Sequence, residues 1–180
     1  MKIKATKRGF NILNLVLFLS ILWSSTAISQ VSPRAAGDST GRPGDVHIIH
    51  ADRLGFKKMT DSSQIRFASG KVEIRQNTTL FYCDSVAINS VTRIMEAFGH
   101  VHINDNDSIN IFSDFMRYRG QERTAYLKNN VRLTDGKGTL TTSELDYDLN
   151  TKIAVYGKQG KLVSGKSVLT SQAGTYYGDT

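Results

Sequence analysis

The sequence predicts an all-β protein, a stack of antiparallel strands built from a unit that recurs about every 30 residues. Two independent sets of residues, one apolar and one mostly acidic, recur with this spacing from residue 70 onward. Within the units, apolar and polar residues alternate with the two-residue period of a half-buried strand. Beyond the N-terminal segment, no stretch sustains the apolar stripe of a long helix.

The first 29 residues have the layout of a secretory signal peptide. Basic residues lie between Lys2 and Arg8, an apolar run covers residues 12–23, and mostly small residues follow up to Ser29. The apolar run is well short of the ~20 residues that a membrane-spanning helix needs, so the alternative of an uncleaved anchor has less support. We therefore expect a secreted protein that begins at Gln30.

Charge and composition limit what the rest of the chain can do. Residues 1–29 hold four basic residues and no acidic one, so their removal lowers the formal net charge from +7 to +3. No block of five or six like charges remains, which argues against a nucleic-acid partner. Residues 30–45 contain both prolines among Gly, Ser, Asp and Arg, and are expected to form a flexible leader. Residues 46–180 suffice for one domain with an apolar core.

The repeat begins at Gly70 and is seen in four successive units. Each unit opens with glycine or asparagine and a short apolar strand, and ends its second strand in an acidic or amide residue. The opening apolar residues, spaced 29, 30 and 31 apart, are Val72, Val101, Val131 and Leu162. The closing residues, spaced 30, 30 and 28 apart, are Asp84, Asp114, Glu144 and Gln172. A half-unit with Asp52 in the acidic position precedes them.

These units are strands rather than helices. Segments such as 72–74 and 131–133 alternate apolar and polar residues, and clusters of turn residues at 104–107 and 135–138 separate the runs. Each unit would supply about two to four short strands, and stacking buries a continuous apolar strip that no single unit could bury.

One pattern recurs in phase: alanine, glycine, valine and an aliphatic residue at alternate positions, then a polar turn, then a strand that ends in a small and an acidic residue. It is carried by residues 68–74 and 97–103, by Ile49-His50-Ala51-Asp52, and by the pairs Cys83-Asp84 and Ser113-Asp114. This pattern resembles the OstA-like family of periplasmic lipopolysaccharide-transport proteins, which includes a soluble bridge protein and the N-terminal domain of its outer-membrane partner. The resemblance covers about residues 46–180.

The third unit departs from the family pattern. Asn129 and Asn130 stand where glycine is expected, Glu144 replaces aspartate, and residues 139–141 contain threonine where aliphatic residues are usual. The repeat also stops within a unit at Thr180, so we expect the chain to be a fragment of a longer protein.

The resemblance implies a twisted, jelly-roll-like stack of antiparallel strands, open along one side, that holds lipid A acyl chains inside. It also implies a periplasmic location, with association at the outer membrane, and end-to-end pairing of stacks into a bridge between membranes. The implied partners are lipopolysaccharide, other lipopolysaccharide-transport proteins and further copies of the chain in a head-to-tail oligomer.

Strand alternation selects the residues expected to line the interior. They are Ile49, Val72, Ile74, Phe81, Val101, Ile103, Ile109, Ile111, Met116, Tyr118, Val131 and Leu133, with Met95 and Leu169 as additions. Alternation alone favours an ordinary filled core for such residues. The resemblance favours a lipid-binding groove instead, so both interpretations stay open at this point.

The ends of the stack are expected to carry unpaired strand edges that can bind another subunit. The N-terminal edge is expected near residues 46–51 and the C-terminal edge near residues 168–177. Lys161 and Lys166 lie near the second edge, where lysines discourage indiscriminate pairing. Further chain that covers these edges is the alternative.

No motif predicts catalysis, a cofactor or a metal. His100 and His102 share a strand without a third ligand at a recognisable spacing, and the turn at 104–108 lacks the glycine and glutamate of a calcium loop. The recurring acidic residues are interpreted as corner hydrogen-bond acceptors rather than as catalytic pairs. Cys83, the only cysteine, is expected to be a buried, unreactive thiol.

The favoured function is therefore non-enzymatic binding and transport of lipopolysaccharide toward the outer membrane. A structural β-solenoid with a filled core is the main alternative. A β-helical enzyme acting on polysaccharide is the third, and it would require clustered acidic residues on one exposed face.

Overall fold

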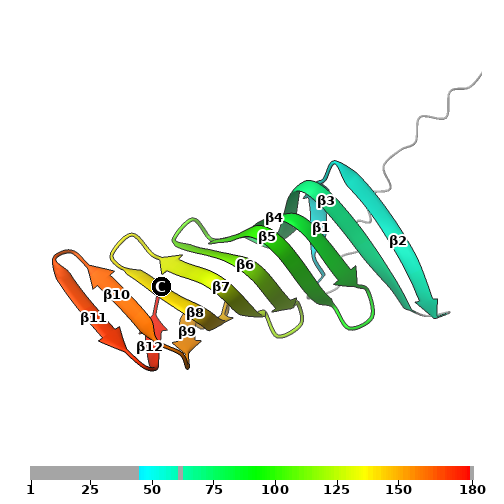
Figure 1. Ribbon diagram of the computed structural model, residues 1–180. Coiled ribbons are helices and arrows are strands. Elements are labelled where there is room, and N and C mark those ends of the chain that lie inside the picture. The colour runs from blue at the N-terminus through cyan, green and yellow to red at the C-terminus, as the bar shows by residue number, and fades with distance from the viewer. Residues whose placement is uncertain (1–44, 61–62, 179–180) are drawn as a thin grey trace, which may run out of the picture. The chain divides into compact units, whose positions relative to one another are not determined.

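The computed structural model describes residues 45–60 and 63–178. The expected signal peptide, residues 30–44 of the leader and the chain end at Thr180 lie outside these residues. The described residues form one 12-stranded sheet in which every pairing is antiparallel (Figure 1). The strands are β1 (His47–His50), β2 (Arg53–Thr60), β3 (Ser63–Gln76), β4 (Thr79–Asn89), β5 (Ile94–Asp105), β6 (Ile109–Arg119), β7 (Thr124–Thr134), β8 (Thr139–Asp148), β9 (Ile153–Tyr156), β10 (Gly160–Ser164), β11 (Ser167–Ser171) and β12 (Gly174–Tyr177).

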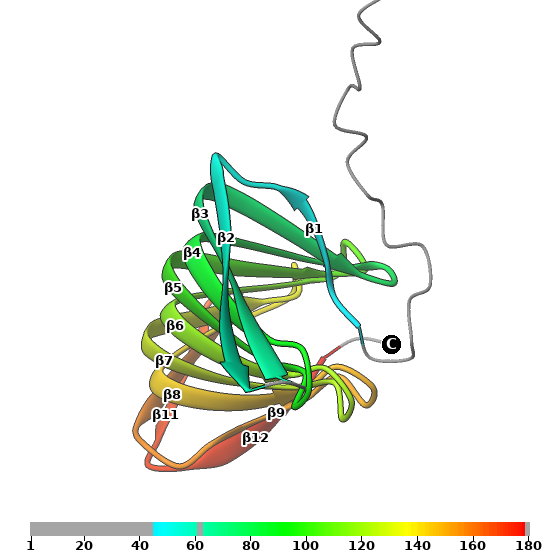
Figure 2. The same ribbon diagram turned by 90° about the vertical axis from the view of Figure 1, so that its right-hand side faces the viewer.

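The sheet bends along one line, so that each long strand contributes to two half-sheets (Figure 2). Half-sheet A contains, in order, β1, the later half of β3, the earlier half of β4, the corresponding halves of β5 to β8, and then β10 and β11. Half-sheet B contains β2, the other halves of β3 to β8, and then β9 and β12. The sheet does not close into a barrel, because β1 and β2 at one end do not pair with β11 and β12 at the other. The predicted all-β, antiparallel stack that stays open is confirmed.

The bend, which we call the corner, consists of β-bulges at the start of the first three sequence units. The registers of β3 with β4 and of β5 with β6 shift at residues 69–72 and 98–101. Gly70 and Gly99 lie there with φ of +80° and +71°, a conformation that glycine adopts without steric cost. In the third unit Asn129 and Asn130 take this place, and asparagine tolerates the left-handed region better than most residues do. The departure from glycine in the sequence therefore preserves the bulge.

The recurring acidic residues lie at the same corner. A Cβ on Gly99 would lie 2.3 Å from Oδ2 of Asp84, so glycine is required for the close approach of this carboxylate. Asp84 is also 2.8 Å from Nδ1 of His100, and Asn130 donates a hydrogen bond of 2.6 Å to Asp114. The Nζ atom of Lys158 donates to Glu144 at 2.7 Å. The interpretation of these residues as corner hydrogen-bond acceptors is confirmed.

Alternate residues of both half-sheets point into a shared interior. Eleven of the 12 side chains predicted to line it are buried there, as is Met95. Because the strands bend at the corner, each half contributes its own inward set, and the two sets face each other. The described residues contain no helix long and apolar enough to cross a membrane.

The prediction that Ile49 faces the interior is wrong, because its side chain is 47% exposed. Ile48 lies opposite Ile74 and shares its inner face, so Ile49 points the other way. Counting back from Asp52 fails because the register of β1 shifts between Ile48 and His50. Leu169 does share the inner face, opposite Leu162, but it is 61% exposed because β11 is the last strand of half-sheet A.

Candidate functional site

The interior contains a continuous apolar strip that runs across half-sheet A from end to end. Its members lie directly opposite one another on neighbouring strands and therefore share a face. In order they are Ile48, Ile74, Phe81, Ile103, Ile111, Leu133, Leu140, Leu162 and Leu169.

Half-sheet B presents two inward rows to this strip. The row nearer the corner is apolar and consists of Leu54, Ala68, Val86, Ala97, Met116, Leu127 and Leu145. The second row is mixed and consists of Phe56, Arg66, Ile88, Met95, Tyr118, Ala125, Tyr147, Ala154 and Tyr176. The interior thus has two facing apolar walls, and the tyrosines and Arg66 of the second row add polar groups along one margin.

The protein's own side chains fill the middle of the interior. Ile74, Met95 and Ile103 are 0% exposed, and the rings of Phe81 and Tyr118 meet at a centroid distance of 4.8 Å. Hydrocarbon could occupy the middle only after the two half-sheets move apart, since packed interiors leave no room for further atoms.

The two ends of the interior are exposed. At the N-terminal end the inward residues Leu54 and Phe56 of β2 are 69% and 77% exposed. At the C-terminal end Leu169 of β11 is the exposed member. Leu54 and Phe56 alternate with polar or small residues in the sequence, but they follow Asp52, whereas alternation counted back from the acidic residues selects only the strands that precede them.

Polar side chains join the two half-sheets on the side opposite the corner, and we call this line of contacts the seam. Each bridge has an acidic or amide residue on the side of half-sheet A, either in a strand or next to one. Its partner on the side of half-sheet B is a tyrosine or a basic residue, in a strand or in a turn. The four bridges are Asp45 with Arg93, Gln76 with Tyr118, Asp105 with Tyr147 and Lys152, and Asp135 with Tyr176.

The Asp105 bridge is the most deeply buried. Its carboxylate is 1% exposed and accepts hydrogen bonds of 2.9 Å from Thr79 and 2.9 Å from Tyr147, as well as one from Nζ of Lys152. Burial, and then the negative charge of Asp105, raises the pKa of Tyr147. Burial likewise raises the pKa of Tyr118 to about 12. Both hydroxyls therefore stay protonated and can donate across the seam.

In the outer bridge, burial and hydrogen bonding have opposing effects on the pKa of Asp135. Partial burial opposes ionisation of this carboxyl, but hydrogen bonds from Tyr176 and from the backbone amides of Lys137 and Gly138 outweigh it and lower its pKa. The Tyr176 hydroxyl donates to Asp135 at 2.7 Å. The carboxylate form is thus the one that the seam stabilises.

The described residues give little support for a reactive thiol or a metal site. Cys83 is buried, and burial raises the pKa of its thiol to about 12, so the expectation of an unreactive thiol agrees with its surroundings. His100 binds Asp84, whereas His102 stacks between Tyr82 and Phe112. Across residues 45–60 and 63–178, no three His, Cys, Asp or Glu side chains group closely enough to hold a metal ion.

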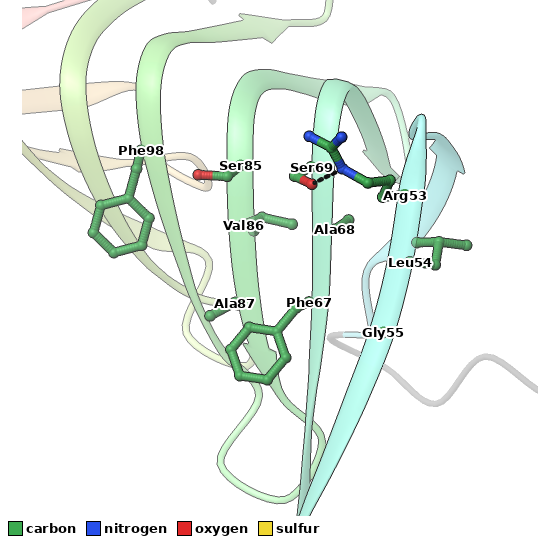
Figure 3. A pocket seen from close by; sticks show the side chains of 10 residues that line it. All are labelled: Arg53, Leu54, Gly55, Phe67, Ala68, Ser69, Ser85, Val86, Ala87 and Phe98. Atoms are coloured by element: carbon green, nitrogen blue, oxygen red, sulfur yellow. Dashed lines mark hydrogen bonds between the residues drawn. The ribbon is translucent and has the colours of Figure 1, made fainter.

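A shallow pocket of about 530 Å³ lies on the outer face of half-sheet B, over β2 to β5 (Figure 3). Phe67 and Phe98 line it and are 41% and 44% exposed, and Arg53 donates to Ser69 at its rim. Figure 3 shows Leu54 and Val86 on the opposite face of the same strands. Leu54, Ala68 and Val86, which belong to the inward apolar row of half-sheet B, also line the pocket, but it contains none of the residues predicted to line the interior.

Comparison with known proteins agrees with this architecture. The family model described as OstA-like protein matches residues 44–180. A search of curated proteins found no match. Among solved structures, the chain is similar to LptH from Pseudomonas aeruginosa, described as the LptA-homologous periplasmic component of the conserved lipopolysaccharide transport device. The two are 12% identical with a TM-score of 0.53, over 71% of this chain and 94% of LptH. At this identity, the likeness shows a shared fold.

Proposed function

Because the chain belongs to the OstA-like protein family, we propose that it binds lipopolysaccharide in the periplasm and passes it toward the outer membrane. The observation that carries the proposal is the continuous apolar strip of half-sheet A, faced by the apolar row of half-sheet B. Acyl chains between these surfaces gain roughly 25 cal/mol for each Å² of apolar surface removed from water. No covalent chemistry is needed, so the protein acts as a carrier rather than as an enzyme.

Strand edges support the second part of the proposal, end-to-end assembly. Among residues 45–60 and 63–178, no strand pairs with the outer edges of β1 and β2 at one end or of β11 and β12 at the other. Exposed inward residues accompany these edges, Leu54 and Phe56 at the N-terminal end and Leu169 at the C-terminal end. Pairing the C-terminal edge of one stack with the N-terminal edge of the next would satisfy the backbone groups and continue the apolar strip. The partner is a second copy or another lipopolysaccharide-transport protein of the same fold.

Transport in the periplasm requires export. We infer that residues 1–29 direct secretion and are removed, that residues 30–45 form a leader, and that residues 46–180 form the lipid-binding domain. We expect the protein recovered by osmotic release to begin near Gln30, and N-terminal sequencing checks this. Recovery of Met1 in a membrane fraction would contradict it.

The acyl chains, rather than the sugars, are expected to provide the affinity. The purified secreted form, incubated with radiolabelled lipopolysaccharide, should co-elute with intact lipid on gel filtration. Lipopolysaccharide stripped of its acyl chains should bind at least tenfold more weakly, because it has no hydrocarbon to place between the half-sheets. Equal binding of the two forms would move the site to the outer surface and overturn the proposal.

A further inference from the structure

The seam bridges recur with the same period as the strands. The bridging tyrosines lie at 118, 147 and 176, which are 29 residues apart, and each contacts an acceptor 41 or 42 residues earlier in the chain. The basic residues of the seam, Arg93, Arg123 and Lys152, are 30 and 29 residues apart. The seam is therefore part of the repeated unit and not an isolated set of contacts.

The backbone at the three basic positions is unusual. Arg93, Arg123 and Lys152 have φ of +54°, +56° and +61°, the left-handed conformation that glycine and asparagine adopt most easily. A long cationic side chain stands at this position in three successive units in spite of that cost. A cation at this strained position indicates that the positive charge beside the seam has a functional role.

One of these cations has incomplete partners. Nη2 of Arg123 is 3.5 Å from the hydroxyl of Thr79, at the limit of a hydrogen bond, and Nε of Arg123 is buried without a hydrogen-bond partner. A buried guanidinium N–H that lacks an acceptor is costly, and an oxyanion is the acceptor that fits its geometry best. Arg123 also lies beside Tyr118. An anion bound to Arg123 would therefore compete with Gln76 as the acceptor for the Tyr118 hydroxyl.

The seam is also the line along which the interior can open. At the corner the half-sheets share continuous backbone, and within each half-sheet the neighbouring strands are joined by full ladders of hydrogen bonds. Across the seam each bridge consists of a few side-chain hydrogen bonds and ion pairs. Separation of the half-sheets therefore breaks the fewest interactions when it occurs at the seam.

We propose that the seam is a latch opened by an acylated, anionic lipid, with Arg123 binding the anionic headgroup while the acyl chains enter the interior. This inference rests on the proposed function and adds to it the route of entry and the residue that meets the headgroup. When the half-sheets part, the hydroxyl of Tyr118 and the carboxylate of Asp105 reach water, and the headgroup supplies the acceptor that Arg123 lacks.

Cys83 reports on the latch without any lipid. It is the only cysteine, it points into the interior, and it is buried. In Tyr118→Phe/Tyr147→Phe/Tyr176→Phe the rings remain but three bridging hydroxyls are lost. Under native conditions, we expect N-ethylmaleimide to label Cys83 faster in this variant than in the parent. After the rate is corrected for the rise in the global unfolding constant, the increase should still be at least tenfold. The matched control is Tyr126→Phe, which removes a hydroxyl that contacts Glu144 on the outer face, and it should leave labelling unchanged.

The outcomes separate the latch from the transport function. If labelling of Cys83 rises only as much as global unfolding does, the bridges are merely structural and the latch is overturned, whether or not lipid binds. If labelling rises as expected but no variant takes up fluorescent lipopolysaccharide, the transport proposal fails while the opening of the seam stands.

The headgroup assignment has its own test. Arg123→Gln should bind lipopolysaccharide at least fivefold more weakly than the parent, whereas the two proteins should bind dephosphorylated lipopolysaccharide equally. Arg119→Gln, an exposed arginine on the outer face of β6, is the control and should not differ from the parent with either lipid. An equal loss for both lipids in Arg123→Gln would overturn the role of Arg123 in binding the headgroup.

Discussion

Phe81→Asp is expected to lower the free energy of unfolding by at least about 4 kcal/mol, enough to unfold most marginally stable domains. Phe81 is 1% exposed, lies between Ile74 and Ile103 in the apolar strip, and packs against Tyr118. Truncation of such a ring costs about 3–5 kcal/mol, and a carboxylate without a partner adds a further desolvation cost. Denaturant titration followed by circular dichroism measures the change.

The neighbouring residue provides the control for Phe81→Asp. Tyr82 is also aromatic, lies on the same strand and points to the outer face, where it stacks on His102. Tyr82→Asp should cost about 1 kcal/mol, because the new carboxylate stays hydrated. A Phe81→Asp protein as stable as Tyr82→Asp would mean that water already reaches this part of the interior, contrary to the packed middle described above.

Unlike Phe81→Asp, the double variant Leu54→Asp/Phe56→Asp is expected to leave the monomer folded. Its end-to-end association constant should fall at least tenfold, or about 1.4 kcal/mol in the free energy of association. Both residues face inward on the terminal strand β2 but are mostly exposed, so their replacement removes little buried surface from the monomer. In an assembled pair they would be covered by the next stack, and two carboxylates would then have to be buried there.

Sedimentation equilibrium over a range of protein concentrations measures this association. Val91→Asp is the matched control, since Val91 is 57% exposed and lies in the turn between β4 and β5 rather than on a terminal strand. If both variants associate as the parent does, the N-terminal end is not an assembly surface.

Sequence patterns predicted the repeat, the strands and the hydrogen-bonding role of the acidic residues, because each depends on local chemistry. Alternation identifies which face of a strand is buried, and the positive φ at Gly70 and Gly99 restricts the residue type at each bulge. Ile49 was assigned to the wrong face because a bulge in β1 shifts the alternation of inward and outward residues by one. No residue type in that strand indicates the bulge.

The seam shows the limit of such reasoning. Tyr118 was predicted as an apolar lining residue, whereas its hydroxyl bridges to Gln76, 42 residues away. The 29-residue spacing of the three tyrosines was visible in the sequence, but their partners depend on how closely the half-sheets approach, which alternation does not encode. For the same reason, the sequence left open whether the interior is a groove or a filled core.

Photo-crosslinking in cells that make lipopolysaccharide can show whether acyl chains occupy the interior. A benzophenone amino acid at position 81 places the reactive ketone in the interior, and the same residue at position 82 places it on the outer face of the same strand. We expect a lipopolysaccharide adduct from position 81, and likewise from 103 and 111, but not from 82 or 132. If no interior position ever captures lipid from a protein that is folded and exported, the transport account is contradicted and a structural solenoid with a filled core replaces it.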